Sequence, residues 1–137
     1  MSKNRSINKN KMAFQISGTT VIDNNRGLKQ YGDTLYAFGN TGTSATLDLS
    51  NGNFITATLT GSCTFSFSNP TSNACAFTLV LTNDGTAGRT ITWPAAVIWP
   101  SGSIPSRTTS ANKTDVYTFF TVNSGSTWFG NLAQYNY

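Results

Sequence analysis

The chain of 137 residues contains no histidine and no glutamate, so all five of its acidic residues are aspartates. Without histidine, no serine or cysteine can be activated by an imidazole base, and carboxylate chemistry would have to draw on two of the five aspartates. A closed zinc site is also disfavoured, because the chain has only two cysteines and no histidine to complete four ligands. The sequence therefore predicts a protein that is not an enzyme, with no catalytic residue, no metal and no cofactor.

Asp84 lies in the segment TNDGTAGR, which superficially resembles a calcium loop. The segment lacks the spacing of oxygen ligands that such a loop needs, and it also lacks the glycine and lysine spacing of a phosphate-binding loop. We therefore interpret Asp84 as a turn residue.

Charge is scarce, because Asp, Lys and Arg together make up 10% of the chain. A soluble domain usually has about 25% charged residues. The absence of glutamate removes a good helix former, whereas the many β-branched residues favour strands. The composition predicts an all-β fold in which helix is a minor component.

Positive charge is concentrated at the N-terminus, where Lys3, Arg5, Lys9 and Lys11 precede Phe14 and Ile16. We interpret these six residues as an anchoring arm that grips another protein; a solvated terminus is the alternative. Nucleic acid is the weakest of the candidate partners, since no aromatic residue is interleaved with the four charges. No segment has the apolar length of a membrane span or the core of a secretory signal, so we expect no membrane partner and synthesis in a cytoplasm.

Cys63 and Cys75 each lie in phase with apolar residues two and four positions away. This spacing predicts that both face the core of a strand-rich fold. Free thiols are favoured over a disulfide if the chain stays in a reducing cytoplasm.

Residues 12–44 consist of short apolar pieces separated by glycine and asparagine turns. Leu28, Tyr31, Leu35 and Phe38 follow a helical spacing, which allows one short helix there. Regular alternation begins at residue 45, and Asn51-Gly52 predicts a hairpin between residues 45–49 and 54–60. Further strands are predicted at 63–67, 75–81, 89–93, 97–99, 115–122 and 127–132.

Seven or eight short strands at this spacing predict an antiparallel β-sandwich or jelly roll over residues 45–137, preceded by an extended N-terminal segment over residues 1–44. Such a sandwich has edge strands that invite pairing with other chains. Lysines that would discourage such pairing are few beyond the arm, where only Lys29 and Lys113 occur. We therefore expect an assembled state in which the edges are covered.

The last third of the chain contains all three tryptophans, and Trp93 and Trp99 each precede a proline. We expect these two residues and Trp128 to pack in the core or between subunits; an aromatic platform for sugars or single-stranded nucleic acid is the alternative. Tyr135 and Tyr137 are expected to dock on the fold or on a neighbour.

The loop over residues 101–113 carries only two charges, Arg107 and Lys113. A loop of this kind is a candidate for surface recognition, and a plain solvated loop is the alternative.

From residue 45 to the end, the order of a WP…WP pair, a Ser/Thr-rich loop, a D-V-aromatic strand and a closing T-W-aromatic-G strand resembles the C-terminal domain of small bacteriophage virion proteins and tail-fibre tips. Residues 15–28 are similar to the strand-and-turn units of phage fibre shafts. The resemblance implies a homotrimer in a virion, with the major capsid protein or a tail component as partner. A short chain favours a head decoration protein, and the alternative is a short tail fibre or fibre tip that binds a host surface glycan.

Overall fold

The computed structural model describes residues 14–16, 19–22 and 33–137. Its contacts divide the chain into two units, Met1–Gly32 and Asp33–Tyr137. In the first unit, β1 (Phe14–Ile16) pairs with β2 (Thr19–Ile22) in an antiparallel register that sets Phe14 opposite Ile22. The four basic residues of the predicted arm lie outside the described residues.

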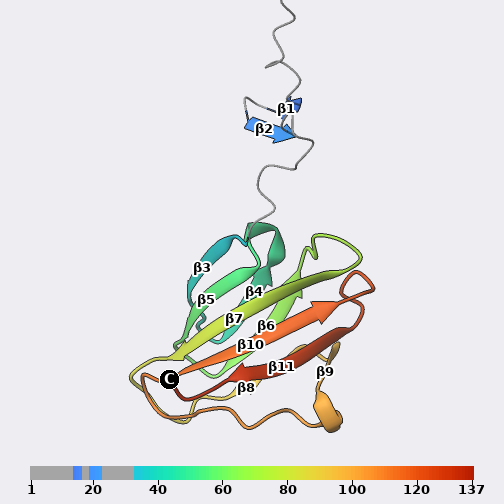
Figure 1. Cartoon of the computed structure of the whole chain (residues 1–137). Helices are drawn as coiled ribbons and strands as arrows, with labels where there is room; N and C mark the ends of the chain where they lie inside the picture. The colour runs from blue at the N-terminus through green and yellow to red at the C-terminus, as the bar shows by residue number, and fades with distance from the viewer. Residues whose placement is uncertain (1–13, 17–18, 23–32) are drawn as a thin grey trace, which may run out of the picture. The chain divides into compact units, whose positions relative to one another are not determined.

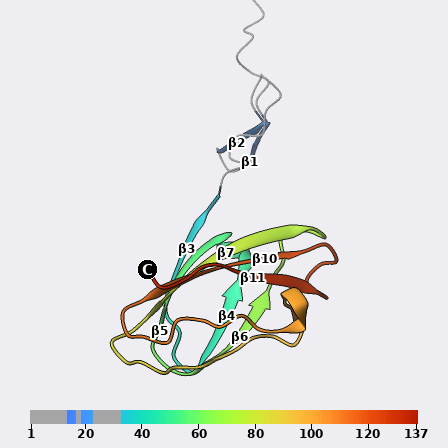
Figure 2. The ribbon, with the colours of Figure 1, turned by 60° about the horizontal axis from the view of Figure 1, so that its bottom comes forward.

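The second unit is built of two β-sheets, a mixed six-stranded sheet and a parallel three-stranded sheet (Figures 1 and 2). The six-stranded sheet has the order β3-β5-β7-β10-β11-β9, and the three-stranded sheet has the order β4-β6-β8. Their bounds are β3 Leu35–Asn40, β4 Ser44–Asp48, β5 Phe54–Leu59, β6 Cys63–Ser68, β7 Cys75–Asn83, β8 Ile91–Thr92, β9 Val97–Ile98, β10 Thr114–Thr121 and β11 Trp128–Gln134, with 3₁₀ turns at Leu49–Asn51 and Pro100–Gly102. The described residues contain no α-helix, so the prediction of an all-β fold is confirmed.

Alternation along each strand creates the core. In β7, the side chains of Phe77, Leu79 and Leu81 are buried, whereas their neighbours in the strand are half-buried or exposed. Successive side chains of a strand point to opposite faces, so one face of this sheet is apolar and covered. The three-stranded sheet contributes Leu47 and Phe65 to the same buried cluster, which means that the two sheets share one core.

Strand pairing differs from the prediction. β4 and β5 lie in different sheets, and β4 pairs with β6 in a parallel register. The predicted hairpin at Asn51-Gly52 is therefore wrong, and so is the expectation of purely antiparallel sheets. The chain passes from the six-stranded to the three-stranded sheet three times, from β3 to β4, from β5 to β6 and from β7 to β8. As a result, β3, β5 and β7 lie parallel in one sheet, and β4, β6 and β8 lie parallel in the other.

The turn at Asn51-Gly52 has a different use. Leu49 is buried in the core, so the chain turns inward after β4 instead of reversing within the sheet. A Cβ on Gly52 would lie 2.5 Å from the carbonyl oxygen of Thr34, so only glycine fits beside the start of β3. Asn53 accepts a hydrogen bond from the Thr34 amide at 2.7 Å, which fixes the two segments together.

The C-terminal half is antiparallel. β10 lies between β7 and β11 and pairs with both in antiparallel register. β9 closes this edge by pairing parallel to β11.

The second unit begins at Asp33, earlier than the predicted boundary at residue 45. The reason is that β3 pairs along β5 from Leu35 to Asn40. Leu35 and Phe38 are therefore in a strand, and the helix that their spacing allowed is not formed there. The earlier part of that spacing, Leu28 and Tyr31, lies outside the described residues.

Candidate interaction surface

The six-stranded sheet has an outer face whose composition follows from the register of its strands. Cross-strand rows of outward positions run along the sheet, and each row can be read from the paired residues. One row is Ala76, Phe120, Phe129 and Ile98; the next is Leu35, Phe54, Thr78, Thr118 and Asn131; the next is Ala37, Thr56, Val80, Val116 and Gln134; the last is Thr58, Thr82 and Thr114. We call these residues the outer face of the six-stranded sheet.

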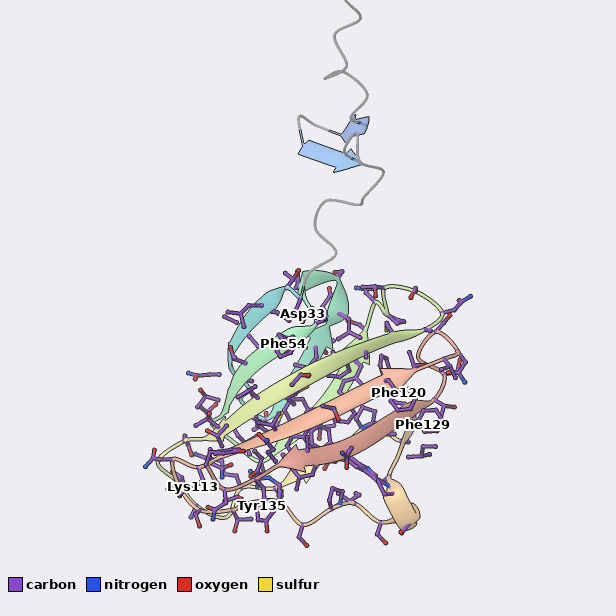
Figure 3. The ribbon with its side chains drawn as sticks, in the orientation of Figure 1. Asp33, Phe54, Lys113, Phe120, Phe129 and Tyr135 are labelled. Atoms are coloured by element: carbon purple, nitrogen blue, oxygen red, sulfur yellow. The ribbon has the colours of Figure 1, made fainter. Side chains whose placement is uncertain are left out.

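None of these outward positions, all within residues 33–137, carries a charged side chain. The charged residues of the same unit lie at strand ends and in loops; Lys113 and Asp33 are labelled in Figure 3 at two borders of the sheet. Exposed strand faces normally carry polar and charged residues, because they contact water. A face this poor in charge has the composition of a surface that is covered by a partner.

Two phenylalanines form the most apolar part of the outer face. Phe120 and Phe129 face each other across β10 and β11, with ring centroids 4.7 Å apart and an interplanar angle of 11° (Figure 3). Phe120 is 48% exposed and Phe129 is 37% exposed. Ile98 extends this patch to β9, while Phe54 and Leu35 extend exposed apolar surface to the opposite edge of the sheet.

A pocket of about 410 Å³ opens beside the phenylalanine pair. It lies over β9, β10 and β11, and its lining is Ile98, Trp99, Pro100, Thr118, Phe120, Phe129, Gly130 and Asn131. Only Thr118 and Asn131 offer polar side chains, so the pocket can take an apolar or aromatic group with one or two hydrogen bonds at its side.

Gly130 allows the wall of the pocket to form. A Cβ on Gly130 would lie 2.8 Å from Val97 Cγ1, 2.9 Å from Trp99 Cζ3 and 3.0 Å from Phe119 Cε1. The absence of a side chain therefore lets β9 and the Trp99 ring close over β11. Packing and not backbone conformation requires glycine at this position, since the backbone of Gly130 is extended within the strand and any residue could adopt it.

The tryptophans lie within or against the core. Trp93 and Trp128 are buried, and Trp99 is half-buried and packs on Trp93 with ring centroids 5.6 Å apart. These positions fit the packing role expected of them, and they leave only the edge of Trp99 on the pocket wall. A platform of three exposed tryptophans is not formed.

Arg107 does not present its charge at a loop tip. Its guanidinium donates to the backbone oxygen of Arg89 at 2.6 Å and to the side-chain oxygen of Asn83, which is buried. These bonds tie the loop over residues 101–113 to the end of β7. Two nitrogens of the guanidinium donate within the fold and the residue is half-buried, and a role of Arg107 in surface recognition stays a prediction. Lys113 is half-buried beside the start of β10.

Asp84 and Arg89 form an ion pair at 2.6 Å, with two hydrogen bonds between the guanidinium and the carboxylate. The Arg89 guanidinium holds the pKa of the Asp84 carboxyl below its usual value. Asp84 also accepts a hydrogen bond from the Thr86 amide, as expected of a turn aspartate.

The C-terminus is attached through its backbone. Thr114 and Tyr137 exchange two backbone hydrogen bonds of 3.1 Å, and Asp115 accepts a bond from the Asn136 amide. The rings of Tyr135 and Tyr137 are nevertheless 67% and 61% exposed. The terminal segment is therefore attached to β10 by its backbone while both rings remain exposed, and docking of the rings on a neighbour stays a prediction.

Both cysteines are free thiols. Cys63 is buried, which raises the pKa of its thiol, and Cys75 is half-buried. Within residues 14–16, 19–22 and 33–137, no three Cys or Asp side chains come together in a way that could hold a metal ion.

Sequence reasoning missed the outer face of the six-stranded sheet. The signal is present in 75–81 and 115–122, where the alternating set that faces outward has no charged residue and contains Val80, Val116 and Phe120. In a strand with one face in water, the outward set of side chains would normally be polar or charged.

Comparison with models of protein families, with curated proteins and with solved structures finds no match for this chain. Among the described residues, no helix has the length and apolar character to cross a bilayer. Inference about function therefore depends on the surfaces of the second unit and on the resemblance of the sequence.

Proposed function

We propose that this chain is a non-enzymatic structural protein of a bacteriophage virion, a homotrimeric head decoration or cement protein attached through its N-terminal arm. The observation that carries the proposal is the uncharged, partly apolar outer face of the six-stranded sheet, which is suited to protein assembly. The order of tryptophan, proline and aromatic motifs from residue 45 onward adds the resemblance to virion proteins.

In this proposal the second unit is a knob built as a two-sheet β-sandwich, and Phe14 and Ile16 belong with the basic arm that contacts the capsid. The second unit holds its core within 33–137, so the proposal requires that the arm can be removed without unfolding the knob.

Deletion of residues 1–25 tests this function. The truncated protein is expected to keep the circular dichroism of the full chain and to lose attachment to virions. Quantitative mass spectrometry of purified particles, with the full chain as control, measures attachment. Normal decoration by the truncated protein would show that the arm is not the anchor.

Copy number tests the location on the particle. A ratio to the major capsid protein near one, or within severalfold of it, is expected for a decoration protein. A few copies per virion would favour the second candidate function, a short tail fibre or fibre tip.

The second candidate is recognition of a host surface glycan, and the pocket beside Phe120 and Phe129 favours it. Aromatic faces with adjacent hydrogen-bonding groups such as Thr118 and Asn131 are suited to sugar rings. The test is binding of the protein to host cells. Loss of binding in Asn131→Ala, with intact binding in Ser66→Ala, would support this candidate. Equal binding by all three proteins would exclude the pocket as its site.

A further inference from the structure

We infer that the outer face of the six-stranded sheet is the surface through which copies of this chain bind one another. The inference rests on the proposed homotrimer and names the contact surface within it. Three observations on residues 33–137 carry it: charge, area and the location of exposed apolar side chains.

Charge restricts the partner. None of the outward positions that make up the outer face is Asp, Lys or Arg, so the face offers no charge that would attract a charged partner. An uncharged surface binds best to another uncharged surface, because a charge placed against it would lose its water without gaining a counterion. The same face on two further copies, turned toward a common threefold axis, meets this condition.

The area of the outer face is close to that of a standard protein interface. Six strands spaced about 4.8 Å apart span roughly 25 Å, and strands such as β7 and β10, with nine and eight residues, span roughly 25–30 Å. The face therefore measures on the order of 600–700 Å² before side-chain relief is added. A standard protein interface buries about 800 Å² on each partner, so this single face approaches what a specific complex needs.

Exposed apolar side chains are concentrated on the same face. Of the nine large hydrophobic residues that are exposed in the described chain, five belong to the rows defined above: Leu35, Phe54, Ile98, Phe120 and Phe129. Large aromatic residues are typical of the centre of an interface, where their burial dominates affinity. The pocket beside the phenylalanine pair supplies the concavity into which a side chain of the second copy fits.

The outer face of the three-stranded sheet gives the internal control. Its outward positions are Ser44, Thr46, Asp48, Thr64, Ser66, Ser68 and Thr92. Asp48 is the one charged residue among them, at the end of β4, and the others bear hydroxyl groups. This face is equally free of Lys and Arg but has no apolar side chain to bury. A self-association surface is therefore expected on one sheet and not on the other.

The test compares one charge on each face in the full-length chain. Phe120→Asp and Thr64→Asp both place a carboxylate at an outward position in an inner strand of its sheet. Sedimentation velocity measures the mass, and circular dichroism with thermal unfolding reports the fold. We expect a trimer for the unmodified chain and for Thr64→Asp, and at least a 100-fold weaker association for Phe120→Asp.

Thr118→Asp provides a second variant in case Phe120→Asp does not fold. Thr118 is half-buried, outward and polar, so its replacement removes no aromatic packing from the fold. Loss of association in Thr118→Asp with unchanged circular dichroism would support the inference on its own.

The failures are distinguishable. An unmodified chain that is monomeric at all concentrations would overturn the homotrimer and this inference together, and would leave the face to another partner. An unmodified oligomer that persists in both Phe120→Asp and Thr118→Asp would leave the homotrimer intact and overturn only the assignment of its surface.

Discussion

The two outer faces of this protein differ although they belong to sheets that share one core. The three-stranded sheet exposes serine and threonine, and Thr46 and Ser66 form a hydrogen bond of 2.8 Å across two strands. The six-stranded sheet exposes Phe54, Phe120 and Phe129 instead. Because charge is nearly absent from both, the two faces differ mainly in exposed apolar surface, which is the property that favours contact with another protein.

The largest expected change in the free energy of unfolding comes from comparing an inward with an outward residue of β10. Phe119→Ala should lower the free energy of unfolding by about 3–5 kcal/mol, because the ring is buried among Phe77, Trp93 and Trp99. Phe120→Ala, the adjacent outward residue, should cost about 1 kcal/mol or less in dilute protein, since it loses only the contact with Phe129. Urea unfolding of both variants checks this, and equal costs would break the distinction between the two sides of the sheet.

The pH dependence of stability should give the next largest effect, because Tyr117 faces the core side of β10. Burial, and then the nearby Asp115 carboxylate, raise the pKa of Tyr117 to about 12. The unfolded chain loses this proton near pH 10, so the stabilisation is fully present below pH 10 and is lost as pH rises to about 12. The loss should be on the order of 2–3 kcal/mol more than in Tyr117→Phe, as followed by unfolding at pH 9 to 12. An identical pH profile in the variant would mean that this layer admits water.

Gly130→Ala probes the pocket on the six-stranded sheet. The new methyl group would meet Val97 and Trp99 at under 3.0 Å, so β9 must shift. We expect a loss of about 1–3 kcal/mol and greater exposure of tryptophan to a fluorescence quencher. Gly85→Ala, at a position where nothing lies within 4 Å, is the control. Unchanged quenching in both variants would contradict the packing of Trp99 over Gly130.

The smallest effect is expected on the three-stranded sheet. Thr46→Ala removes the hydrogen bond to Ser66 at an exposed site and should change the free energy of unfolding by about 1 kcal/mol or less, with no effect on association. Thermal unfolding and sedimentation velocity check both expectations. A change in the mass of the oligomer would instead indicate an interface on the outer face of the three-stranded sheet.

The candidate surface could be predicted only in part from the sequence. The alternation in 75–81 and 115–122 predicts which side chains share a face, and both strands are found there. The sequence does not say that Phe54, Phe120 and Ile98 end on one surface, because that depends on β5 and β9 joining the same sheet. The use of Arg107 inside the fold could not be foreseen either, since its acceptors are 18 and 24 residues away.

The sequence by itself determined the all-β class and the location of most strands from residue 54 onward. Each of these follows from local alternation or composition, which act along the chain. Only the tertiary structure decided that the strands before and after Asn51-Gly52 lie in different sheets. Alternation is the same whether a strand returns beside its neighbour or crosses the core, and here the burial of Leu49 and the contact of Gly52 with Thr34 favour the crossing.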